Sequence, residues 1–182
     1  MEFKQLAELF EKLDSTTKRG LKTAYIAEFL SRIDEPDEYE RCLLLLKGRT
    51  TPEWDTTKLN VAAKTLIKAL AQASGFSTQD IEDKWKDAGD LGLVAETIIA
   101  QKTQATLFSS PLTTEKVIAT LRKVPTQQGG NSVRAKTSLI SELITSADPI
   151  EAKYVTRITL EIMRIGAGVG ILRDAIIWST FP

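Results

Sequence analysis

The sequence predicts an all-α fold, a compact bundle of about ten helices. Along nearly the whole chain, apolar residues recur at spacings of three and four, which is the period of an amphipathic helix. No stretch shows the sustained alternation of polar and apolar residues that marks a half-buried strand. With 182 residues, of which 42% are hydrophobic, the chain is long enough to bury one ordinary core. We therefore expect a single helical domain over residues 1–182.

Six helices are expected in the first half of this domain, over about residues 1–100. In the second helix, Leu21, Tyr25 and Phe29 are spaced to face the core. Gly75 suits the left-handed C-terminal cap of the fourth helix, and Asp90 suits the N-cap of the sixth. The expected helices run from Phe3 to Leu13, Leu21 to Ile33, Tyr39 to Lys47, Lys58 to Ser74, Ser77 or Thr78 to Ala88, and Asp90 to Ile99.

Four more helices are expected in the second half, over about residues 112–182, after a polar loop at 101–111. Thr113 can cap the first of them, and Pro125 prevents its continuation. Asp148 and Pro149 form an N-cap followed by a proline at the first helical position. The expected helices run from Thr113 to Leu121, from Asn131 or Ser132 to Ile144, from Asp148 to about Arg164, and from about Gly170 to Trp178.

The composition excludes several kinds of chemistry. The chain has no histidine, which removes Ser-His-Asp catalysis, Cys-His catalysis and histidine-ligated zinc. The single cysteine, Cys42, precedes four leucines, so it is expected in a helix core and can form neither an internal disulfide nor a thiolate metal cage. We expect no catalytic residue, no metal site, and a reducing, intracellular environment. The N-terminus does not resemble a secretory signal, and no apolar run approaches the roughly 18 residues of a membrane span, so we expect a soluble protein.

The net charge is zero, so binding to a polyanion must depend on where the charges lie. Residues 1–91 carry 14 basic and 17 acidic side chains, and residues 92–182 carry 10 basic and 7 acidic ones. The net charges of the two halves are therefore about −3 and about +3. The second half is the better candidate for binding a polyanion, although a solvated surface would explain the same difference.

Two glycine clusters, at 126–132 and 164–170, each stand between one helix and the next. Glycines before a helix allow a close approach to the free amides of its first turn, where the positive end of the helix dipole favours phosphate. Both clusters also fit a simpler interpretation as helix caps and tight turns. Neither is a Walker loop, because no Gly-Lys-Ser or Gly-Lys-Thr follows. The stretch Thr16-Thr17-Lys18-Arg19 allows the same two interpretations, a helix cap or a third phosphate contact.

Six ordered segments then carry a resemblance to a known family. These segments are Gly89 to Glu96, Leu112 to Glu115 with Val117 and Leu121, Gly130 to Lys136, Asp148 to Val155 with Arg157, Met163 to Gly166, and Leu172 to Ala175. On them the chain resembles, from end to end, the N-terminal DNA-binding domain of ATP-dependent DNA ligases of the archaeal and eukaryotic type, and we expect an archaeal member. It departs from the family pattern at Asn131, where a glycine is usual, and at Glu161 and Met163, where the family favours glycine and leucine.

The resemblance implies a helical domain that lies along the minor groove of nicked duplex DNA and contacts backbone phosphates on both sides of the break without reading sequence. The enzyme that contains such a domain seals nicks in DNA replication, repair and recombination. The expected DNA-binding residues are Thr17, Lys18, Arg19, Gly129, Gly130, Asn131, Ser132, Lys136, Arg164, Gly166, Gly168 and Gly170.

The catalytic part of such a ligase is expected to lie outside this chain. Family members form an adenylate on the lysine of a Lys-x-Asp-Gly motif, which is absent here, since Lys84-Trp-Lys-Asp87 is followed by alanine. We therefore expect a fragment that is inactive alone and needs no cofactor, whereas ATP and a divalent metal such as Mg²⁺ are implied for the missing adenylation and OB domains. A monomer is expected, in the cytoplasm with the nucleoid.

The polar loop contains one further candidate site. Gln104 is followed at three and four residues by the bulky Leu107 and Phe108, which must either dock on the core or bind a partner. Archaeal ligases carry a sliding-clamp motif in this domain, and Gln104 to Phe108 resembles it, with Leu107 in place of an aromatic residue. Recruitment to the sliding clamp is therefore the alternative function.

Overall fold

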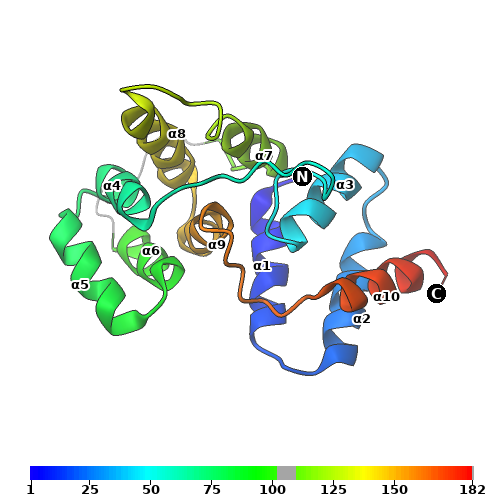
Figure 1. Ribbon diagram of the computed structural model, residues 1–182. Coiled ribbons are helices and arrows are strands. Elements are labelled where there is room, and N and C mark those ends of the chain that lie inside the picture. The colour runs from blue at the N-terminus through cyan, green and yellow to red at the C-terminus, as the bar shows by residue number, and fades with distance from the viewer. Residues whose placement is uncertain (102–109, 182) are drawn as a thin grey trace.

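The structure, a computed structural model, describes residues 1–101 and 110–181 (Figure 1). The described residues form ten helices and no strand, which confirms the predicted all-α class. The helices are α1 Phe3–Asp14, α2 Arg19–Leu30, α3 Pro36–Leu46, α4 Ala63–Ser74, α5 Thr78–Ala88, α6 Leu91–Ala100, α7 Thr114–Arg122, α8 Ser132–Ser146, α9 Pro149–Thr159 and α10 Val169–Thr180.

Local capping explains most of these boundaries. Thr113 accepts a hydrogen bond from the Lys116 amide at the start of α7, and Asp90 accepts one from Gly92 at the start of α6. Asp148 and Glu151 form a reciprocal capping box at the start of α9. At the other ends, Gly75 and Gly89 terminate α4 and α5 in the left-handed conformation, with φ values of 82° and 67°.

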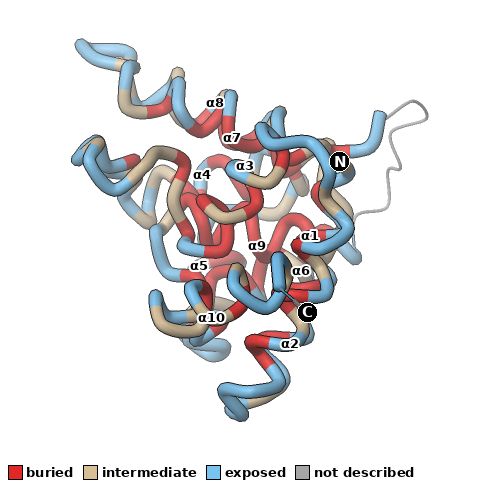
Figure 2. Tube along the Cα trace, turned by 90° about the vertical axis from the view of Figure 1, so that its right-hand side faces the viewer, coloured by how far each residue is buried: buried red, intermediate tan, exposed pale blue. Residues whose placement is uncertain are grey.

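Helix α9 lies at the centre of the molecule. Every residue from Glu151 to Thr159 is buried, and α6, α1 and α8 pack against it. The buried segments, red in Figure 2, gather around this helix. Further pairs of helices connect the early and late parts of the chain, namely α4 with α8, α3 with α7 and α2 with α10. The two predicted halves therefore share one hydrophobic core.

In helix α2 periodicity misplaced one residue of the predicted apolar face, whereas Tyr25 and Phe29 are partly buried against the core. Leu21, expected inside, is 41% exposed. The buried side chains of α2 include Lys22, Thr23 and Ile26 instead. The helix packs on one side against α1 and on another against α10, so its buried surface is set by two neighbours that the sequence does not place.

The largest differences from the predicted helix limits are in α4 and α9. Helix α4 begins at Ala63 and not at Lys58, because Asn60 adopts a left-handed conformation with φ 48°, although Leu59 in the preceding segment is buried. Helix α9 ends at Thr159, five residues before the expected limit. Glu161 and Arg164 adopt left-handed conformations, with φ values of 58° and 57°, which a continuing right-handed helix cannot contain.

Candidate nucleic-acid interface

The turn between α1 and α2 and the loop between α9 and α10 meet at one shallow depression. The side chains and glycines that line it are Thr17, Arg19, Lys22, Gly166, Gly168, Gly170 and Ile171. Five of these were predicted as phosphate contacts from two stretches that are about 150 residues apart in the sequence. They are brought together because α10 packs against α2, and Figure 1 shows these two helices side by side at the lower right.

Both helices begin at this depression without a side-chain cap. The N-cap residues, Lys18 of α2 and Gly168 of α10, accept no side-chain hydrogen bond from the first turn. The opening amides of each helix therefore keep their donors for solvent or a ligand, at the positive end of the helix dipole. Thr16, which the sequence allowed as a cap, accepts instead from the Lys18 amide at 3.2 Å, just before the helix.

Arg19 extends across the start of α10. Its Nη2 donates to Asp174 Oδ2 at 2.7 Å, and Arg173 donates to the other carboxylate oxygen at 2.9 Å. The hydrogen bonds from Arg173 and Arg19 lower the pKa of Asp174. A Cβ on Gly170 would lie 3.4 Å from Arg19 Nη2, which is ordinary van der Waals contact, so the position of Arg19 does not by itself require glycine there. One carboxylate is thus shared by two arginines, which leaves the local charge positive.

Lys22 was not predicted as part of the site. Its side chain is buried, and its Nζ donates to the Ile165 carbonyl at 2.5 Å. A Cβ on Gly166 would lie 2.6 Å from this ammonium, and Gly166 has φ +61°, so both space and backbone conformation require glycine there. The signal that could have found Lys22 is its position three residues after Arg19, on the same helical face.

Arg164 lies outside this depression, at the junction of α5 and α6. Its Nη2 donates to the Gly89 carbonyl at 3.3 Å, and its Nη1 is 3.6 Å from Asp90 Oδ2. The side chain is 52% exposed, so the guanidinium keeps further donors toward solvent. The Arg164 side chain therefore contacts Gly89 and Asp90 and does not line the depression.

The second predicted loop precedes α8. Gly129, Gly130 and Asn131 are exposed, whereas Ser132 and Lys136 are half-buried. Gly129 has φ +86°, and a Cβ at Gly130 would meet nothing within 4 Å. Asn131 has φ −99°, a conformation open to any residue, so the backbone does not require the glycine that the family usually has there. Asn131 makes no side-chain cap bond, and the first amide of α8, that of Ser132, donates to the Gly129 carbonyl at 3.1 Å. The next amides of the first turn have no side-chain cap.

The structure does not gather the two loops into one cluster. In Figures 1 and 2 the loop before α8 lies at the upper left, and the segment between α9 and α10 runs through the lower part of the molecule. Any ligand that touches both loops must therefore be extended, as a nucleic-acid duplex is.

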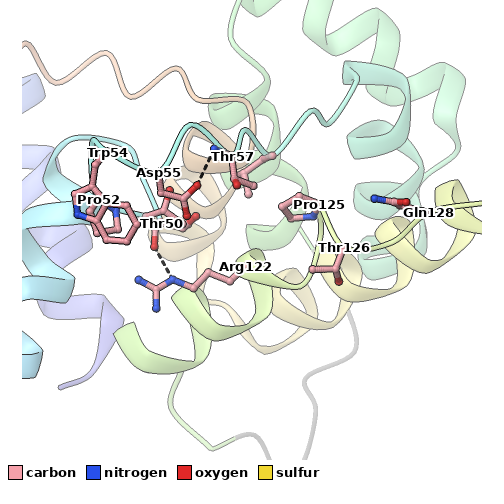
Figure 3. Close-up of a pocket in the computed structure, with 11 residues that line it drawn as sticks. Thr50, Pro52, Trp54, Asp55, Thr57, Arg122, Pro125, Thr126 and Gln128 are labelled. Atoms are coloured by element: carbon pink, nitrogen blue, oxygen red, sulfur yellow. Dashed lines mark hydrogen bonds between the residues drawn. The ribbon is translucent and has the colours of Figure 1, made fainter.

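A larger depression lies next to the loop before α8 (Figure 3). It is lined by residues of the segment at 50–59 and by Arg122, Pro125, Thr126 and Gln128, but by none of the predicted contacts. Arg122 Nε donates to the Thr50 carbonyl at 2.7 Å, which ties this segment to α7. Trp54, the aromatic residue of this segment, is 83% exposed.

Several expectations concern features outside this surface. Gln104, Leu107 and Phe108 lie outside the described residues. Cys42 is buried as predicted, and burial raises the pKa of its thiol to about 12, so the thiol stays protonated. Among the residues that the structure describes, no group of three or more His, Cys, Asp or Glu side chains could hold a metal ion. No helix in the described part of the chain has the length and apolar character needed to cross a bilayer.

Comparison with known proteins identifies the family of the chain. The family described as the DNA ligase N terminus matches residues 2–177. The DNA ligase of Methanothermobacter thermautotrophicus is 40% identical over 177 residues, which cover 96% of this chain and 31% of that protein. The DNA ligase of Nanoarchaeum equitans is 41% identical over 97% of this chain and 31% of its own length. The DNA ligase of Archaeoglobus fulgidus is 39% identical over 96% of this chain and 31% of its own length.

The chain thus spans 31% of the length of each of these three relatives. The match covers nearly all of this sequence and includes both glycine loops and the turn before α2. The chain therefore belongs to the family of DNA ligase N-terminal domains.

Proposed function

We propose that this chain binds nicked double-stranded DNA through its backbone phosphates, along the minor groove and without reading sequence, as the DNA-gripping module of an ATP-dependent DNA ligase. The observation that carries the proposal is the depression where Thr17 and Arg19 meet Gly166, Gly168 and Gly170. Two uncapped helix starts, close-approach glycines and cations are the combination that a phosphate needs, and they require no metal ion.

The second loop supplies the other end of the interface. Ser132 adds a hydroxyl donor, and Lys136 adds a cation one turn into α8. Because the two loops lie far apart in both views, each would hold a different phosphate of the duplex. Contacts to the phosphate backbone at separated points support binding across a break without recognition of base edges.

The parent protein, on this proposal, seals nicks in DNA replication, repair and recombination, inside the cell and in association with the nucleoid. The adenylated lysine, ATP and Mg²⁺ would belong to domains beyond the part described here, since this sequence has no Lys-x-Asp-Gly motif. The isolated chain should accordingly act as a monomeric binding module and form no adenylate with radiolabelled ATP.

The test is fluorescence anisotropy of nicked and intact duplexes across a salt series. The double variant Lys136→Ala with Arg164→Ala should weaken binding about tenfold or more at about 100 mM salt, and it should flatten the salt dependence, because each lost phosphate contact releases fewer counterions. The double variant Arg32→Ala with Lys47→Ala is the control, since it also removes two positive charges but at positions outside both glycine loops. Equal affinity of the two double variants would remove the proposed phosphate role.

An alternative function is recruitment to the sliding clamp through Gln104, Leu107 and Phe108. The observation in its favour is the pair of bulky apolar residues in an otherwise polar stretch. Capture of the chain by purified clamp without DNA, lost in Phe108→Ala, would support this function. Clamp binding that is unchanged in that variant would exclude these residues as the motif.

A further inference from the structure

Two lysines of the described chain are almost completely buried, and their surroundings differ. Lys153, which is 4% exposed, places its Nζ 2.5 Å from Glu11 Oε1 and 3.7 Å from Glu96 Oε2. Lys22 is 7% exposed, and among the described residues it has no carboxylate within 4.0 Å. Its one acceptor there is the Ile165 carbonyl.

A buried ammonium with a single acceptor is unusual in a stable protein. The group carries three N–H donors and a full charge, and burial of a charge is costly unless an opposite charge or several hydrogen bonds compensate it. The core around α9 supplies carboxylates to Lys153. The packing of α2 against α10 supplies none to Lys22, so any compensating charge must enter from the depression that Lys22 lines.

The walls of that depression suit an anion. Thr17 and Arg19 stand on one side, and Gly166, Gly168 and Gly170 on the other. The carboxylate of Asp174, on α10, forms ion pairs with Arg19 and Arg173 and none with Lys22. At Gly166 the missing side chain leaves the ammonium open, because a Cβ there would come within 2.6 Å of Nζ. The buried Lys22 ammonium therefore supports anion binding independently of the two helix N-termini.

We propose that Lys22 is a phosphate-binding residue at the base of this depression. It holds one backbone phosphodiester of the DNA between its ammonium and the starts of α2 and α10, and its bond to the Ile165 carbonyl keeps the glycine loop in place. The inference rests on the proposed DNA-binding function. It assigns one of the phosphate contacts to Lys22, a buried residue of α2.

The experiment compares Lys22→Met with Lys153→Met, which remove equal charges from equally buried positions. Salt-dependent anisotropy with nicked duplex is measured beside thermal unfolding. Lys22→Met should weaken binding about tenfold at about 100 mM salt and reduce the magnitude of the log–log salt slope by about 0.9, and it should lower the melting temperature less than Lys153→Met does. Lys153→Met should lower the melting temperature, because it leaves Glu11 without its cation, and should keep the wild-type slope.

A second variant separates binding from loop support. Lys22→Gln keeps an N–H donor for the Ile165 carbonyl but carries no charge, so it should show the same reduced slope as Lys22→Met. A wild-type slope in both variants, with a lowered melting temperature, would make Lys22 a structural support and overturn the inference alone. Absence of DNA binding by the wild-type chain would overturn both this inference and the proposed function.

Discussion

Arg157 and Arg164 approach the same carboxylate from two different environments. Arg157 Nη2 donates to Asp90 Oδ2 at 2.8 Å, and Arg164 Nη1 lies 3.6 Å from the same oxygen. The Arg157 side chain is 5% exposed, and it also bonds Asp14 and the Met163 carbonyl. The Arg164 side chain is 52% exposed. One guanidinium is thus consumed by the fold, whereas the other keeps donors for a ligand.

The electrostatics of Asp90 show which partner dominates. Burial opposes ionisation of this carboxyl, but the hydrogen bond and charge of Arg157 outweigh it and hold the pKa of Asp90 below its ordinary value. The charge of Arg164 adds a smaller effect in the same direction. The comparison shows that a residue type alone does not assign a role. Burial and the number of acceptors decide whether an arginine stabilises the core or remains available to a phosphate.

The largest expected effect comes from the buried side of this comparison. Arg157→Met should lower the free energy of unfolding by about 3 to 5 kcal/mol, because it leaves Asp90 and Asp14 without their partner in a partly dehydrated site. Urea unfolding followed by circular dichroism measures the change. A loss below about 1 kcal/mol would mean that the ion pairs around α9 are solvated and that the contrast with Arg164 is false.

Glu151, another buried ionisable residue of α9, sharpens the comparison because no cation among the described residues forms an ion pair with it. Burial raises the pKa of Glu151 to about 7, and the charges of Asp148 and Glu2 act in the same direction. The Asp148 amide, which donates to Glu151, and the Lys4 ammonium oppose this shift. Since the folded pKa exceeds the ordinary value of 4.5, the stability from the protonated group is complete below about pH 4.5 and is lost as pH rises through about 7.

Glu151→Gln tests this directly, because glutamine also fits the capping box but does not titrate. Thermal melts at pH 5 and pH 7.5 should show that the wild type loses more stability over this interval than the variant does, and that the variant is the more stable protein at pH 7.5. Parallel pH profiles for the two proteins would show that Glu151 does not titrate in this window.

The smallest expected effect on stability comes from the exposed side of the comparison. Arg164→Met should change the free energy of unfolding by no more than about 0.5 kcal/mol, since its ion pair with Asp90 is long and its side chain is half-exposed. The same variant should bind nicked duplex several-fold more weakly. A variant that melts early yet binds DNA as the wild type does would reverse the roles assigned to the two arginines.

Local sequence patterns were sufficient wherever the cause was local. The caps at Asp90, Thr113 and Asp148 and the glycine termination at Gly75 were predicted and confirmed, because each depends on a hydrogen bond or a dihedral angle within one turn. Where the cause was distant, the prediction failed. Leu21 was placed on the wrong face, and α9 was extended too far, because neighbouring helices and a left-handed turn decided both.

The candidate site divides in the same way. The glycine clusters and the Thr17 to Arg19 turn were recognisable from composition and family resemblance, but Lys22 was not, because a lysine in a helical pattern is normally solvated. Only the packing of α10 against α2 buries Lys22 and brings the Ile165 carbonyl to its ammonium.

By itself, the sequence determined the all-α class, the order of the helices and the chemistry available at their ends, since these follow from a period of 3.6 residues and from caps a few positions apart. The tertiary structure alone decided which surfaces of the helices are buried, which cations are neutralised and which remain open beside the glycine loop. The physical reason is that burial and charge compensation depend on contacts between residues more than 140 positions apart, and no local pattern records such contacts.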